Sequence, residues 1–289
     1  MNYFFIMIAD ILLAVIGLLG LLISSLTDLK TREVPDFVSY SMIFSGFAVR
    51  LFHSLIYSDW NYFLYGLLGF VIMFIFANLM YYGRQWGGGD SKLLMALGVI
   101  FATKPFFVDI KMTFLLYLFF NIIIIGALYG LIWSSILAVK HFSHFKREVK
   151  KLFSEKVMKK KVYSFTLLAL VLFIMFFLAS DSKIRILLGF SILLSAVYPY
   201  FYILIKAVEN VCMYKEIPIS KLTEGDWIVN STIKNKFNIS EIGIEKHQIE
   251  LIKKSKLKTI TIKEGIPFVP CFFMGLVVSL FFNNLFFLF

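Results

Sequence analysis

Two acidic residues lie where polar connections meet apolar segments of this chain. Asp90 follows a run of glycines, and Asp28 lies at the end of the first apolar segment, before the chain turns back at Pro35. An acid beside hydrocarbon is costly to ionise, so it marks a candidate functional site. Of two carboxylates held close together, one stays ionised and takes a proton from water, while the other keeps its proton and donates to a scissile carbonyl. We therefore predict that Asp28 and Asp90 form a water-activating pair, which hydrolyses peptide bonds without a metal or a covalent intermediate.

The glycines before Asp90 fit this prediction. They are Gly87, Gly88 and Gly89. Residues without a Cβ let the backbone approach a neighbour closely and adopt a positive φ. An Asp at the start of a helix is also favoured simply as a cap, and this alternative stays open. The second acid, in a matching position, favours the catalytic interpretation.

Other kinds of catalytic site have less support in this sequence. The histidines His53, His141, His144 and His247 form no zinc-binding pattern. Ser91 and Lys92 are adjacent, so on a helix they face about 100° apart and make a poor nucleophile and base. Cys212 and Cys271 are far apart and unaccompanied, which predicts inert thiols. We expect no metal and no cofactor.

Composition predicts an all-α polytopic membrane protein with about eight transmembrane helices, because 60% of the 289 residues are hydrophobic and only 16% are charged. The expected spans are 5–26, 37–57, 60–82, 91–108, 112–139, 162–180, 184–206 and 267–288. The fourth is interrupted by Lys104 and Pro105. The first lacks the flanks of a signal peptide, so we expect it to be an uncleaved span.

The distribution of positive charge predicts the orientation in the membrane. The net charge is +11, and the Lys and Arg residues fall in the connections between apolar spans, which argues against nucleic-acid binding. The connections 27–36, 83–92, 140–161 and 207–266 hold most of them. We expect these to be cytoplasmic and both chain ends to lie outside the cell membrane. Asp28 and Asp90 then share the cytoplasmic face.

Two polar insertions complete the predicted domain organisation. Residues 140–161 carry nine Lys or Arg with apolar residues at helical spacing, which predicts an amphipathic helix on anionic lipid. Residues 226–229 and 258–262 resemble strands around a helix at 244–255, in a unit too small to bury much core alone. The predicted division is a transmembrane peptidase core at 1–206, a small cytoplasmic α+β subdomain at 207–266 and a last transmembrane helix at 267–289.

Two motifs resemble those of a known family. They are the segment from Asp28 to Asp36 after the first span, Asp-Leu-Lys-Thr-Arg-Glu-Val-Pro-Asp, and the segment from Gly87 to Lys92, Gly-Gly-Gly-Asp-Ser-Lys. They resemble the type IV prepilin peptidases, the Gly-x-Gly-Asp aspartyl proteases of membranes. The segments 222–227 and 264–270 look like the extra domain of longer archaeal members. The four-Cys zinc region and the methyltransferase activity of bacterial members have no counterpart in this chain.

The resemblance implies the site and the substrate. It implies that Asp28 and Asp90 are catalytic and that the substrate is a pilin-like or archaellin-like precursor, cut where its short basic leader meets a hydrophobic helix. Glu33 and Asp36 would then attract the cations of the leader, although as caps of the second span they need no such role. Supporting roles fall to Lys30, Arg32, Pro35, Asp36 and Lys92. Lys30, Arg32 and Lys92 are topology anchors or cations that tune the acid pair.

Three alternatives remain open. An archaellin (preflagellin) peptidase or another intramembrane protease of this type would share the chemistry. A proton-coupled transporter would also place acids along a water-filled path, and it predicts further acids in the central spans, where none is evident. A scaffold would use both acids only as caps. The oligomeric state and the role of residues 215–265 stay undetermined.

Overall fold

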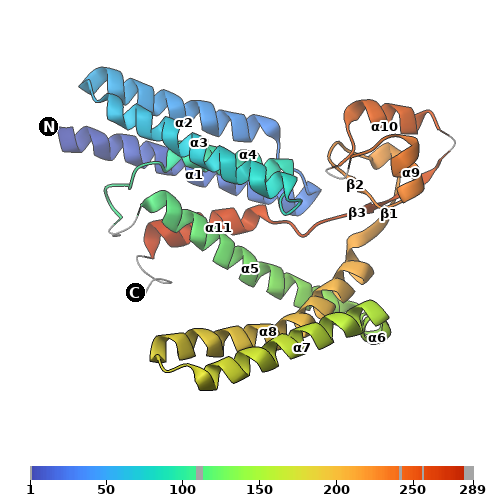
Figure 1. Cartoon of the computed structure of the whole chain (residues 1–289). Coiled ribbons are helices and arrows are strands. Elements are labelled where there is room, and N and C mark those ends of the chain that lie inside the picture. Colours follow the sequence, from blue (N-terminus) through green and yellow to red (C-terminus); the bar gives the residue numbers. More distant parts are fainter. Residues whose placement is uncertain (1, 109–112, 241–242, 256, 283–289) are drawn as a thin grey trace.

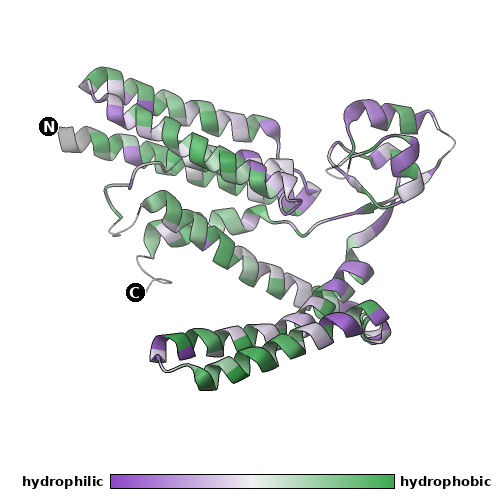
Figure 2. Cartoon of the chain, viewed as in Figure 1, coloured by the Kyte–Doolittle hydropathy of each residue, from purple (hydrophilic) through white to green (hydrophobic). Residues whose placement is uncertain are grey.

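In a computed structural model, the chain folds into long helices and one small mixed unit (Figure 1). The structure describes residues 2–108, 113–240, 243–255 and 257–282. Five helices are long and apolar enough to cross a membrane: Ile6–Thr31, Trp60–Tyr82, Phe114–Lys140, Lys156–Leu178 and Ser182–Met213. The chain is thus a helical, multi-pass membrane protein, as predicted. Figure 2 shows the apolar character of these helices and the polar character of the small unit.

The amino-terminal half forms a bundle of α1 (Asn2–Thr31), α2 (Asp36–Tyr57), α3 (Trp60–Tyr82) and α4 (Gly88–Ile100). Helix α4 is the buried centre of the bundle, since the side chains of Leu93, Leu94 and Leu97 are at most 1% exposed. Its backbone touches that of α3, because a Cβ on Gly98 would lie 2.5 Å from the carbonyl oxygen of Gly69. Close packing of this kind holds helices together in lipid, where hydrophobic attraction is weak.

The expected count of eight spans is not confirmed. The predicted span 91–108 is wrong, because α4 ends at Ile100 after 13 residues. Pro105 lacks the N–H that a continuing helix needs, and the buried guanidinium of Arg50 binds the carbonyls of Val99 and Ile100 instead. The last described helix, α11 (Val269–Phe281), also has 13 residues. Residues 109–112 and 283–289, at the ends of two predicted spans, lie outside the described residues.

Helices α5 (Phe114–Lys140) and α11 pack together beside the bundle, and α11 also packs on α1. Next, α7 (Lys156–Leu178) and α8 (Ser182–Val208) form a hairpin apart from the bundle (Figure 1). The predicted amphipathic helix within 140–161 is α6 (Phe142–Ser154). Its apolar residues pack on α8, with Leu152 buried against Ile203 and Ala207, so protein covers the face expected to lie on lipid.

The small unit begins after the π-helical turn Glu209–Met213. Its sheet has the order β1-β3-β2, with β1 (Tyr214–Pro218) and β2 (Trp227–Ile228) both antiparallel to β3 (Thr259–Lys263). Two strands and the helix α10 (Lys246–Lys253) occur where the sequence predicts them. Strand β1 and helix α9 (Ser231–Lys236) were not predicted. The unit buries its own cluster of Ile and Leu side chains, including Ile228, Ile252 and Ile260, so it has more core than expected.

Candidate active site

The two predicted acids line one cavity of about 1080 Å³. Asp28 comes from the last turns of α1 and is buried, at 7% exposure. Asp90 comes from the first turn of α4 and is half-buried. The charge of Asp28 acts on Asp90, and burial together with that charge raises the pKa of Asp90 to about 7. Residues 62 positions apart in sequence are thus held close enough to titrate as a pair.

Three parts of the chain build the cavity wall. The connection from α1 to α2 contributes residues 32–36, the turn from α3 to α4 contributes residues around 84–92, and the small unit contributes residues from 222–227 and from α10. The loop 222–227 is fixed by its own hydrogen bonds, because the Asp226 carboxylate accepts from the Thr223 backbone N–H at 2.8 Å. The Gly225 N–H donates to the Ile244 carbonyl at 2.8 Å. These hydrogen bonds fix the part of the cavity wall that the loop 222–227 contributes.

The turn from α3 to α4, called the hinge below, precedes Asp90 and is positioned by its packing on α11. Trp86 is buried, and its ring lies 5.8 Å from that of Phe268 and 5.3 Å from that of Phe272. The carboxylate of Asp90 accepts a hydrogen bond from the Gly87 backbone N–H at 3.1 Å. This bond is the cap that the sequence left as an alternative, so Asp90 caps its helix and faces the cavity at once.

Two roles were expected for the three glycines, close backbone approach and a positive φ. The structure supports close approach, and it does so at Gly89. A Cβ on Gly89 would lie 2.7 Å from the Cβ of Val34, so the hinge approaches the α1–α2 connection closely there. A Cβ on Gly87 or Gly88 would meet only ordinary contacts. The expectation of a positive φ is wrong, because the only described glycines with a positive φ are Gly225 and Gly243.

The supporting residues divide into two groups. Arg32, Pro35, Asp36 and Lys92 line the cavity, whereas Lys30 is exposed and does not line it. The predicted cap role of Asp36 is wrong: the α2 cap position is Pro35, and Asp36 pairs with Lys92 at 2.6 Å. This ion pair joins the start of α2 to the start of α4, which links the two sequence motifs.

A donor that the sequence analysis missed binds Asp28. The backbone N–H of Val269, the first residue of α11, donates to the Asp28 Oδ2 at 3.0 Å. Cys271, two residues further, is fully buried and lies near enough to both acids to feel their charges. The expectation that Cys271 is an isolated thiol therefore misses its position beside the acid pair. No sequence spacing indicates a contact between residues 241 positions apart.

A second polar cluster, also missed, lies at the other end of the bundle. Asp10 of α1 is 5% exposed; its Oδ1 accepts from the Tyr62 hydroxyl at 2.8 Å and its Oδ2 from the Phe106 N–H at 3.0 Å. Arg50 is fully buried beneath Tyr62, with its guanidinium carbon 4.6 Å from the ring centroid. The signal in the sequence was an acid inside an apolar span.

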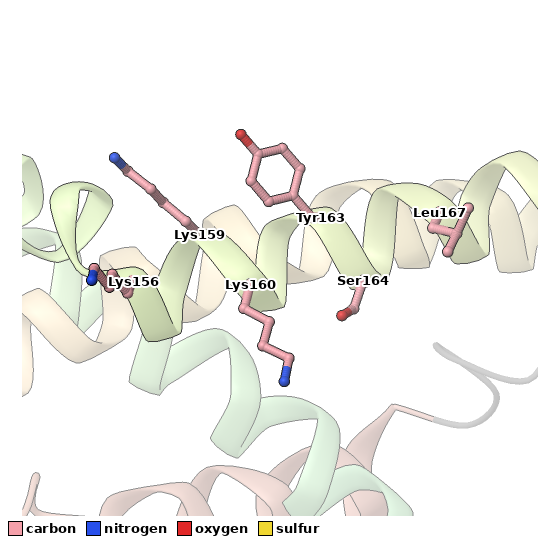
Figure 3. A pocket seen from close by; sticks show the side chains of 6 residues that line it. All are labelled: Lys156, Lys159, Lys160, Tyr163, Ser164 and Leu167. Atoms are coloured by element: carbon pink, nitrogen blue, oxygen red, sulfur yellow. The ribbon is translucent and has the colours of Figure 1, made fainter.

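A shallow hollow on α7 is a different kind of surface (Figure 3). It is lined by Lys156, Lys159, Lys160, Tyr163, Ser164 and Leu167. Lys159 and Tyr163 extend to one side of the helix, and Lys160 and Ser164 extend to the other. These side chains do not converge on a point, so the hollow has the character of a basic helix end at a membrane surface. None of the predicted site residues lines it.

Within the described part of the chain, no three His, Cys, Asp or Glu residues gather as a metal site would require. The residues around Asp28 and Asp90 supply acids, backbone N–H groups and cations. Such a set can hold a water molecule and move protons, which is what hydrolysis of an amide demands.

Comparison with known proteins identifies the region that holds the acids. Residues 15–131 match the model of the type IV leader peptidase family. A preflagellin peptidase of Methanocaldococcus jannaschii is 38% identical over 86 residues, which are 30% of this chain and 36% of that protein. Preflagellin peptidases of Methanococcus maripaludis and Methanococcus voltae are each 34% identical, over 37% and 39% of their length. The alignments thus span well under half of these curated relatives. The segment that carries both acids, residues 15–131, is thus similar to the type IV leader peptidase family.

Proposed function

We propose that this protein is a membrane-embedded aspartyl endopeptidase that removes the leader from pilin-like or archaellin-like precursors at the cytoplasmic face of the cell membrane. The observation that carries the proposal is the shared cavity of Asp28 and Asp90, in which the charge of one acid acts on the other. The similarity to leader peptidases covers the same segment, which supports the assignment.

The proposed chemistry uses one ionised and one protonated carboxyl group. The ionised carboxylate takes a proton from a water molecule, and the resulting hydroxide attacks the carbonyl carbon of the scissile bond. The other acid gives its proton to the carbonyl oxygen. The tetrahedral intermediate then breaks its C–N bond as the leaving nitrogen takes up a proton. A pKa of about 7 keeps much of Asp90 protonated at neutral pH, which this scheme requires of one member.

The substrate proposal rests on two observations. The relatives are named preflagellin peptidases, and the cavity wall carries carboxylates that suit a cationic leader, including Glu33, Glu224 and Glu250. Of these, Glu224 pairs with Lys246 at 3.3 Å, whereas no ion pair is found for Glu33 or Glu250 among the described residues. The nine Lys and Arg of residues 140–161 favour a cytoplasmic position for this end of the molecule.

The transporter alternative has less support. It needs buried acids that are free to exchange protons along a path. Asp10 is a further buried acid within a span, but the Tyr62 hydroxyl and the Phe106 N–H bind its two oxygens. A carboxylate bonded in this way is a structural group of the bundle and a poor relay.

A cleavage assay tests the proposal. Membranes that contain the full chain are incubated with a panel of pilin-like and flagellin-like precursors, and leader removal is followed by the change in precursor mass. Asp28→Asn and Asp90→Asn should each lower the rate roughly 1000-fold or more, and the double variant should be no worse than either, because members of a catalytic unit act together. Asn keeps the size of Asp, so the fold should survive.

Asp36→Asn is the matched control. It removes a carboxylate from the same cavity, but one whose ion pair with Lys92 is partly exposed and therefore contributes little. It should keep its activity within about fivefold, as expected for an interaction of at most about 1 kcal/mol. Processing by both Asp28→Asn and Asp90→Asn at the wild-type rate would exclude the aspartyl mechanism.

A further inference from the structure

The amino end of α11 contacts the carboxylate of Asp28. The first helical residues of any helix have N–H groups without a partner inside the helix, and they favour a negative charge nearby. Here one such donor, the Val269 N–H, binds the Asp28 Oδ2 at 3.0 Å. Pro270 follows within the first turn, where its missing N–H costs no hydrogen bond. The buried carboxylate of Asp28 is therefore a ligand of this helix end.

The surrounding packing fixes the donor in place. The Ser25 hydroxyl lies 3.3 Å from the Val269 carbonyl oxygen, and Val269 itself is fully buried. The ring of Phe268 fills the space over Gly126 of α5, where a Cβ would lie 2.5 Å from the ring. Trp86 packs on the same ring from the α3–α4 turn. The helix end thus cannot shift without moving both α5 and the hinge that carries Asp90.

The two acids differ in what surrounds them. Asp28 has the α11 end on one side and the charge of Arg32 nearby. Among the residues that the structure describes, the Asp90 carboxylate accepts only from the Gly87 N–H at the start of its own helix. Lys92, the nearest cation in sequence, is paired with Asp36. The remaining titratable groups that face the acids are Tyr129 of α5 and Cys271 of α11. Both are neutral near pH 7 in their ordinary states, so they do not reverse this difference.

We propose that the amino end of α11 divides the roles of the pair: Asp28 is the ionised base that takes the proton from water, and Asp90 is the protonated acid that donates to the scissile carbonyl. This assignment rests on the proposed peptidase function. Val269 is then a positioning residue, which acts through its backbone N–H and never touches the substrate. It lies outside residues 15–131, so the carboxyl-terminal part of the chain completes a site whose acids lie in the matched segment.

Infrared spectroscopy tests the assignment without any cleavage. At pH 5.5, below the pKa of about 7, Asp90 should be protonated. The proposed assignment requires that Asp28 be ionised at the same pH. In difference spectra against the wild type, Asp90→Asn should remove a C=O stretch of a protonated carboxyl group, and Asp28→Asn should remove a carboxylate band. The opposite pattern would reverse the roles. This result is readable even if no precursor is cleaved, so it separates failure of the assignment from failure of the proposed function.

A backbone substitution tests the role of α11 in the active enzyme. Replacing Val269 with its α-hydroxy acid analogue turns the amide into an ester and deletes only the N–H. The low-pH limb of the kcat profile should move up by about one pH unit, on the scale of one hydrogen bond to a charged group, while KM and the high-pH limb stay in place.

The matched control makes the same exchange at Val278, which also lies on α11 but past its first turns. It removes an ordinary helix N–H and should leave both limbs unmoved, although it also weakens the helix. An unmoved low-pH limb in the Val269 ester would show that α11 does not set the roles. A shift of the high-pH limb in its place would assign the donor to the acid and overturn the proposal.

Discussion

The bundle of α1–α4 holds a buried acid at each end, and the two ends differ in how completely the acid is bonded. Asp10 and Asp28 lie 18 residues apart on α1, or about 27 Å at 1.5 Å per residue. At the Asp10 end both carboxylate oxygens are bound, and Asp10, Arg50 and Tyr62 do not line the cavity that holds Asp28 and Asp90. At the Asp28 end the carboxyl groups line a cavity of about 1080 Å³.

The difference separates a structural polar cluster from a chemical one. Arg50 uses its guanidinium on the carbonyls of Val99, Ile100 and Tyr62, at 2.7 to 3.0 Å, and so ends α4. The start of the same helix leaves Asp90 facing the cavity. A helix that is fixed at one end and faces a cavity at the other positions its acid firmly while leaving it accessible. Buried charge alone is therefore a weak criterion for a candidate active site, and unfilled bonding capacity beside a cavity is a better one.

Removing the guanidinium of Arg50 should destabilise the end of the bundle that contains Asp10. Arg50→Met keeps an unbranched apolar stem but leaves three carbonyl groups without their donor, and should lower stability by roughly 3 kcal/mol or more. The measurement is thermal unfolding in detergent. Arg185→Met is the control, because Arg185 also binds a backbone carbonyl, that of Ala179, but at an exposed turn. Equal losses in both variants would contradict the structural role of Arg50.

A larger side chain at Gly89 should disturb the end of the bundle that holds Asp28 and Asp90, called the open end below, without unfolding the protein. Gly89→Val places side-chain atoms where Val34 lies, so the turn that carries Asp90 must shift, and cleavage should fall at least tenfold. Gly87→Ala meets only ordinary contacts and should stay near the wild-type rate. Rates of precursor cleavage at saturating substrate measure both. A strong loss in Gly87→Ala alone would show that the close approach to Val34 is not what matters.

The open end should titrate in the neutral range. Burial and the charge of Asp28 raise the pKa of Asp90 to about 7, so its proton is present below that pH and is lost as the pH rises through it. If the acid is needed in protonated form, kcat falls about tenfold per pH unit above this value. A profile of kcat from pH 5 to 9 measures it. Constant kcat up to pH 9 would exclude a proton donor with this pKa.

A charge change in the small unit should affect the binding of the precursor at the open end, and this is the smallest of the expected effects. Glu250→Lys changes the charge of the cavity wall on α10, and should raise KM for a precursor with a cationic leader severalfold while kcat stays similar. Leu251→Lys, the neighbouring exposed residue of α10 that does not line the cavity, is the control. If the two variants give equal KM values, the wall does not contact the leader.

The sequence predicts the acids well because each stands at a marked boundary between polar and apolar segments. Asp28 and Asp90 line one cavity, and their action as a catalytic pair stays a prediction. The contact of Val269 with Asp28 was not predictable, because it depends on how a late helix returns to the first one. Asp10 and Arg50 were overlooked because each lies inside a long apolar run, and only the fold pairs them with Tyr62 and the end of α4.

The length of helix α4 shows that hydropathy alone does not predict where a helix ends. The apolar run to residue 108 suggested a full span, but the helix ends at Ile100, where Arg50 binds its last carbonyls. A side chain from another helix therefore sets the boundary. The strands at 227–228 and 259–263 were predictable because their alternating apolar residues face the small core.

The contact of α11 with Asp28 has a consequence for the synthesis of the protein. A ribosome adds about 5–20 residues per second, so roughly 10 to 50 seconds pass between the synthesis of Asp28 and that of Val269, 241 residues later. From the synthesis of Asp90 until that of Val269, the nascent chain contains both acids but not the donor that binds one of them. A chain that stops early would insert its first helices without a completed site. The order of translation would thus delay the proposed activity until α11 has been made.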